Sequence, residues 1–105
     1  MKKFSKRRPA ALTPADGGVT EFCHSVVPVE GGYEYESVDV IGEPVRTNVK
    51  YALMLERYTA EEIDEMENEK RYSEEPEVVA EYQAYLAVKT QCNDLINTTI
   101  GEGFE

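Results

Sequence analysis

Residues 19–41 read VTEFCHSVVPVEGGYEYESVDVI, and this stretch decides the fold. Its first part, residues 19–29, is rich in β-branched and aromatic side chains, which favour strands. The glycine pair at 31–32 supplies the positive φ angles of a tight connection. Tyr33 and Tyr35 then alternate with acids, as in a half-buried strand. The pattern predicts a β-hairpin over residues 19–41.

The alternation of apolar residues shifts by one position in the second strand of this hairpin. Val38 and Val40 would therefore lie on the opposite face of the strand from Tyr33 and Tyr35. A β-bulge, or a strand that is apolar on both faces, would account for the shift. A lone hairpin is marginal in water, so other elements must cover it. An exposed edge of the hairpin is also a place where a partner strand can add.

Three helices are expected after the hairpin. The first spans about residues 45–58 and is apolar over much of its circumference. Thr59 and Glu62 match a capping box, which starts the second helix, at about residues 60–71. The third helix, about residues 76–97, has an apolar stripe and ends before a glycine. The predicted fold class is therefore α+β, a hairpin packed against about three helices.

The first 18 residues show no strand or helix period and are predicted to form a flexible basic arm. The arm precedes a single small domain at 19–100 and an acidic tail at 101–105. Its charge contrasts with the rest of the chain, which holds nearly all of the 21 acids behind the net charge of −10. The basic residues of the arm are Lys2, Lys3, Lys6, Arg7 and Arg8.

Three roles are open for this arm. It is a solvated tail, a contact to the acidic face of a neighbouring subunit or partner, or a contact to RNA or DNA. Nucleic acid binding is expected only through the arm, because the acidic body repels phosphates.

No catalytic, cofactor-binding or metal site is predicted. His24 is the single histidine, and in a strand it points away from the adjacent Cys23. Cys23 and Cys92 are expected to be reduced thiols in an unexported chain. One histidine and two separated cysteines lack the spacing of a zinc site. An enzyme working through His24 and Cys92 is the remaining hypothesis, and no motif that would activate a nucleophile supports it.

Two groups of short segments are recognisable in the chain. They are LERYTAEE at 55–62 with EYQAY at 81–85, ending near Lys89 and Cys92, and PADG at 14–17 with VVPV at 26–29 and GGYEYE at 31–36. Together they resemble small uncharacterised proteins encoded in phage and prophage gene clusters of gut anaerobic bacteria. The resemblance implies a phage-related setting, with a tail or assembly component as one role, and it supplies no catalytic residues.

The expected location is the cytoplasm of the bacterial host, with association with the virion as the alternative. No apolar run approaches the roughly 20 residues that span a bilayer, and no apolar signal-peptide region follows the basic start. We therefore expect no membrane partner.

The favoured function is a non-enzymatic structural or assembly-helper protein that acts through protein–protein contacts, either with other proteins or with itself. Tyrosine is common at interfaces because it combines contact area with a polar tip. The candidate contact residues are Tyr33 and Tyr35 with the acidic helix face Glu61, Glu65 and Glu69. The alternative is an acidic inhibitor that mimics a nucleic-acid backbone and occupies a basic cleft. The concentration of acids between residues 61 and 81 supports this alternative.

Overall fold

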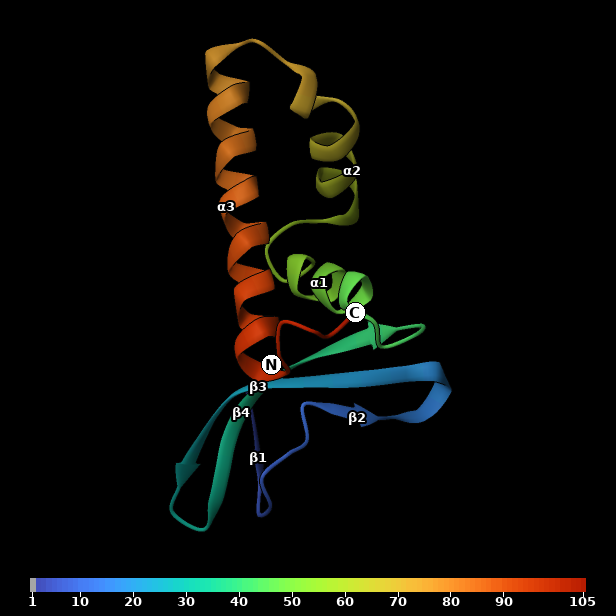
Figure 1. The fold of residues 1–105 in the computed structure, drawn as a ribbon, viewed down its shortest axis with the longest axis vertical. Coiled ribbons are helices and arrows are strands. Elements are labelled where there is room, and N and C mark those ends of the chain that lie inside the picture. Colours follow the sequence, from blue (N-terminus) through green and yellow to red (C-terminus); the bar gives the residue numbers. More distant parts are fainter. Residues whose placement is uncertain (1) are drawn as a thin grey trace.

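The computed structural model describes residues 2–105 and has an α+β fold, with three helices on one side of a four-stranded antiparallel sheet (Figure 1). The strands are β1 (Lys2–Ser5), β2 (Leu12–Pro14), β3 (Val19–Val29) and β4 (Gly32–Ile41). The helices are α1 (Arg46–Met54), α2 (Ala60–Asn68) and α3 (Pro76–Thr99). Two 3-10 turns, η1 (Asp16–Gly18) and η2 (Lys70–Tyr72), complete the element order. The predicted fold class is confirmed.

β3 and β4 form the predicted hairpin at the centre of the sheet. Gly31 makes the turn with a φ of 82°, a value that only glycine adopts without strain. His24 pairs with Glu36 and Val27 with Glu34, so two residues of β3 lie opposite one residue of β4. Ser25, inside this bulge, has a φ of 55°. The bulge therefore lies in β3.

The other strand of the hairpin, β4, carries apolar side chains on both faces. Val38 and Val40 are buried under the helices. Strand alternation places Tyr33 and Tyr35 on the opposite face, where both are half-buried. The shift in the apolar alternation thus reflects a strand whose later residues are buried on the helix face and whose earlier tyrosines are half-buried on the other face.

The N-terminal residues are part of the sheet, whose strand order is β1-β4-β3-β2. The prediction of an arm without regular structure is therefore wrong for β1 and β2, whereas Met1 lies outside the described residues. A two-stranded hairpin leaves unpaired N–H and C=O groups on both edges, and these short strands satisfy part of them. Lys3 pairs with Tyr35 on one edge, and Thr13 pairs with Glu21 on the other.

The helices begin where the sequence predicts, and their ends differ by a few residues. α2 starts with the predicted capping box: Thr59 Oγ1 accepts a hydrogen bond from Glu62 N at 3.1 Å, and Thr59 N donates to Glu62 Oε1 at 2.9 Å. The predicted last turn of α2 is the separate 3-10 turn η2. α1 ends at Met54 instead of residue 58, and the next residues form tighter turns, in which Glu56 N donates to Leu53 O and Arg57 N to Met54 O. α3 extends to Thr99, slightly beyond the predicted 97.

The core lies between the inner face of the sheet and the helices. Tyr85 joins it from the middle of α3, and Ile96 joins it near the sheet. The remaining core side chains are Phe22, Val38, Val40, Val49, Ala52, Leu53, Met54, Ile63, Met66 and Cys92.

The C-terminal segment folds back onto α1. Arg46 donates hydrogen bonds to the main-chain oxygens of Phe104 at 2.5 Å and Gly101 at 2.9 Å, and to Asn93 Oδ1 at 2.8 Å. Phe104 also packs against the core. The C-terminal residues are thus held to the domain by Arg46 and by the packing of Phe104.

The molecule is elongated, with principal extents of 52 × 29 × 25 Å. Its radius of gyration is 15.7 Å, whereas a compact domain of this length has about 13 Å. The cause is visible in Figure 1, where α2 and the first half of α3 project away from the sheet as a helical hairpin. This projection gives the small protein a large surface relative to its core.

Candidate interaction surface at the open edge of β4

The outer edge of β4 is only half covered. Within the described residues, β1 pairs with β4 from Tyr33 to Glu36 and no further. The last part of β4, residues 38–41, pairs with β3 on its inner side. No described strand pairs with it on its outer side. We call residues 38–41 the open edge.

Two main-chain hydrogen bonds show which residues of the open edge face outward. Gly42 N donates to Gly18 O at 3.3 Å, and Cys23 N donates to Ala11 O at 2.8 Å, on the far side of β3. Bonded positions recur at every second residue of an antiparallel pair, so Val38 and Val40 bond to β3. Asp39 and Ile41 therefore turn their N–H and C=O groups away from β3.

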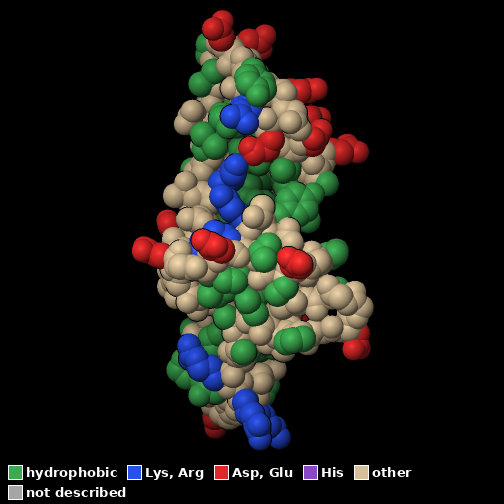
Figure 2. Space-filling model, turned by 45° about the vertical axis from the view of Figure 1, so that its right-hand side comes forward, with side chains coloured by type: hydrophobic (Ala, Val, Ile, Leu, Met, Phe, Trp, Pro, Cys, Tyr) green, Lys and Arg blue, Asp and Glu red, His purple; other side chains and the backbone are tan. Residues whose placement is uncertain are grey.

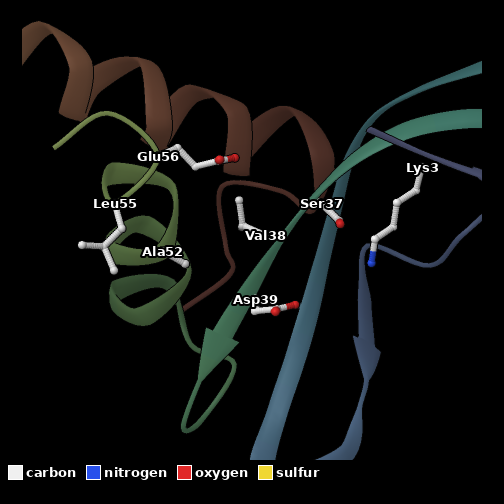
Figure 3. A pocket seen from close by; sticks show the side chains of 7 residues that line it. All are labelled: Lys3, Ser37, Val38, Asp39, Ala52, Leu55 and Glu56. Atoms are coloured by element: carbon white, nitrogen blue, oxygen red, sulfur yellow. The ribbon is translucent and has the colours of Figure 1, made fainter. Parts of the chain in front are cut away.

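A groove separates the open edge from α1. One hollow, of about 310 Å³, is lined by residues of β4 and of the end of α1, as Figure 3 shows. A second hollow, of about 370 Å³, continues past Ile41, Tyr51 and Leu55. Both hollows share Asp39, Ala52 and Leu55, so they lie next to each other, and we call the two together the groove.

The groove exposes large apolar side chains. Ile41 is 81% exposed, and Tyr51 and Leu55 are each 44% exposed. Figure 2 shows hydrophobic side chains gathered across the middle of the molecule, with acidic side chains frequent toward the upper end. Single exposed apolar residues are ordinary, whereas several around one hollow are typical of interaction surfaces.

The charges beside the groove are mainly negative. Asp39 and Glu56 line it, and neither has an ion pair with another described residue. Lys3 also lines the groove, but its Nζ lies 2.5 Å from Glu21 Oε2. This hydrogen bond raises the pKa of Lys3 and lowers the pKa of Glu21. Among the described residues that line the groove, the ion pair thus offsets the charge of Lys3 and leaves the Asp39 and Glu56 carboxylates.

The structure does not bring the predicted contact residues together. Tyr33 and Tyr35 lie in the part of β4 that β1 covers. The acidic face of Glu61, Glu65 and Glu69 is exposed on α2, in the projecting hairpin. Sequence reasoning did not single out Ile41, Tyr51 or Leu55 as a surface. Each looks like a core residue in its own helix or strand, and only the position of α1 beside β4 groups them.

The basic residues of the predicted arm have separate surroundings. Lys2 Nζ pairs with Glu34 Oε2 at 3.0 Å, and Lys3 pairs with Glu21 as described above. Lys6, Arg7 and Arg8 lie exposed in the loop between β1 and β2, without an ion pair to any described residue. Two of the five cations therefore bind the domain's own acids.

His24 and Cys92 line one small cavity of about 160 Å³, together with Glu56 and Arg57. His24 Nδ1 lies 2.9 Å from Ser25 Oγ, and Nε2 is buried without a hydrogen-bond partner among the described residues. Burial lowers the pKa of His24, although Glu36 and Glu56 oppose this effect.

Both cysteine thiols are buried, and burial raises their pKa. Burial raises the pKa of Cys92, whose Sγ lies 3.6 Å from Met54 Sδ. Burial also raises the pKa of Cys23 to about 11. A thiol with a raised pKa is a poor nucleophile near neutral pH, because little thiolate is present. The cavity thus has a histidine from β3 and a thiol from α3 in its lining, and burial disfavours the charged form of each.

The described part of the chain also gives no support for a metal site or a membrane-spanning helix. No group of three or more potential metal ligands is found there. None of its helices combines the length and the apolar character needed to cross a membrane. Comparison with protein-family models, curated proteins and solved structures finds no match for this chain.

Proposed function

We propose that this protein is a non-enzymatic structural or assembly-helper protein that acts by binding another protein at the groove between β4 and α1. The observation that carries the proposal is the set of exposed apolar side chains, Ile41, Tyr51 and Leu55, around one groove beside an unpaired strand edge. Burying such side chains against a partner removes apolar area from water and favours association. The phage-related setting implied by the sequence resemblance remains part of this proposal.

The test is capture of partners by the immobilised protein from a lysate of cells that carry the gene, with a surface variant in parallel. Tyr51→Ser with Leu55→Ser removes apolar area from the groove, and both residues are exposed. We expect the double variant to lose partners that the unaltered protein retains at high salt, because apolar contacts resist screening.

Val79→Ser with Tyr72→Ser is the matched control. These side chains are also exposed, at 39% and 72%, but lie in the projecting hairpin away from the groove. Equal capture by the groove variant and the unaltered protein would refute the proposed function.

An acidic inhibitor of a basic-cleft protein is the second candidate. The supporting observation is that Glu61, Glu65, Glu69 and Glu74 are all exposed in the projecting hairpin, which could enter a cleft. Capture through these acids would weaken with salt and disappear in the variant Glu61→Gln, Glu65→Gln, Glu69→Gln. It would be unaffected by the groove variant.

A further inference from the structure

We infer that the open edge of β4 binds an extended peptide of a partner as an added antiparallel strand, with an apolar–basic–apolar pattern. This inference rests on the proposed function and specifies how the groove is used. The outward N–H and C=O groups of Asp39 and Ile41 supply the main-chain bonds for such a strand.

The length of the site follows from the pairing of β1. That strand ends opposite Glu36 within the described residues, so the added strand has residues 38–41 to pair with. At the rise of an antiparallel strand this is about 14 Å. The occupant is therefore a short extended segment, lying in line with β1.

The two faces of the added strand meet different surroundings. Residues placed opposite Val38 and Val40 turn toward the helices, because directly paired residues share a face. There they enter the groove beside Ala52 and Leu55, where apolar side chains fit. Two of the three side chains are therefore apolar.

The residue placed opposite Asp39 is basic. It lies on the same face as the Asp39 carboxylate, and opposite charges in a cross-strand pair stabilise a sheet. Asp39 is exposed and has no ion pair with a described residue, so a lysine or arginine at this position supplies the opposite charge that its carboxylate lacks.

Charge also favours a basic peptide over a second copy of the chain as the occupant of this edge. Each copy has a net charge of −10. If two copies paired edge to edge, the Asp39 and Glu56 carboxylates of both copies would lie in one interface. Like charges in such a site oppose association. A basic segment of another protein is the complementary occupant.

The test uses the full chain, labelled with ¹⁵N, and the synthetic peptide Thr-Val-Lys-Val-Thr, blocked at both ends. In the free protein, we expect the amides of Asp39 and Ile41 to exchange with solvent much faster than those of Val38 and Val40. Peptide addition is expected to protect Asp39 and Ile41 and to shift resonances of residues 51–56. A Thr-Val-Glu-Val-Thr peptide is expected to bind at least about tenfold more weakly.

Two variants separate strand addition from ordinary surface binding. Ile41→Pro removes one outward N–H but none of the bonds to β3, so binding is expected to weaken about tenfold with the fold retained. Asp39→Lys is expected to reverse the preference between the lysine and glutamate peptides. Asp94→Lys, the same charge change on the exposed surface of α3, is the control and should keep the original preference.

Protection of the Asp39 and Ile41 amides in the free monomer would overturn the inference, as would peptide affinity that Ile41→Pro leaves unchanged. Dimer formation that protects these amides without peptide would overturn it in favour of a second copy. If Ile41→Pro retains partner capture and the Tyr51→Ser, Leu55→Ser variant loses it, strand addition fails while the proposed function stands.

Discussion

Lys3 of β1 and Glu21 of β3 form an ion pair across β4, the strand that separates them, with Nζ and Oε2 2.5 Å apart. The Glu21 carboxylate also accepts a hydrogen bond from Cys23 Sγ at 3.4 Å. The N-terminal strand is thus fastened to the hairpin by a side-chain contact as well as by its main-chain pairing with β4.

Removing this pair should loosen β1. We expect Lys3→Met and Glu21→Gln each to destabilise the protein by about 0.5–1 kcal/mol, because the pair is partly exposed to solvent. The double variant should cost less than the sum, since both changes remove one interaction. Urea unfolding of the four proteins measures the coupling, and Lys6→Met, in the exposed loop, is the control. If the destabilisation of the double variant equalled the sum of the two single variants, the ion pair would contribute no stability.

The close approach of β1 to the hairpin turn gives a second prediction. A Cβ atom at Gly32 would lie 2.3 Å from the main-chain oxygen of Ser5, so Gly32→Ala must displace β1. We expect a destabilisation of about 1–3 kcal/mol and faster amide exchange in β1. Gly103→Ala, where a Cβ would meet nothing within 4 Å, should change neither. If the amides of β1 exchange at the same rate in Gly32→Ala as in the unaltered protein, the prediction that β1 is displaced is wrong.

Arg46 is expected to stabilise the C-terminal end. Its planar guanidinium donates to four separate oxygens, an arrangement that a lysine ammonium cannot reproduce. Arg46→Lys should therefore cost about 1–3 kcal/mol and make residues 101–105 more susceptible to carboxypeptidase. Arg7→Lys, in an exposed loop, serves as the control. Equal digestion of the two variants would contradict the role of Arg46.

His24 should make stability depend on pH. Burial lowers its pKa in the folded protein, so the unfolded chain binds the additional proton first as pH falls. Stability is therefore full above the unfolded pKa of about 6.5 and decreases as pH falls from there toward the lower folded pKa. Urea midpoints between about pH 5 and pH 8 measure this slope. His24→Gln should flatten it relative to the unaltered protein, and an equal slope in both would show that other groups cause it.

The local elements were predictable because their signals lie within a few residues of one another. The capping box of Thr59 and Glu62 placed the start of α2, and the glycine pair placed the hairpin turn. β1 and β2 were missed for the opposite reason. Strands of four and three residues are too short to show a period, and their partners lie far along the chain.

The sequence by itself determined the α+β class, the central hairpin and the order of the three helices, since these follow from local periodicity and turn chemistry. Only the tertiary structure decided that the basic N-terminal segment covers half of one sheet edge and leaves residues 38–41 open. It also decided that Ile41, Tyr51 and Leu55 share a groove. The reason is that strand pairing and the packing of α1 beside β4 join residues distant in sequence, and the pattern of neighbouring residues does not encode which edge remains unpaired.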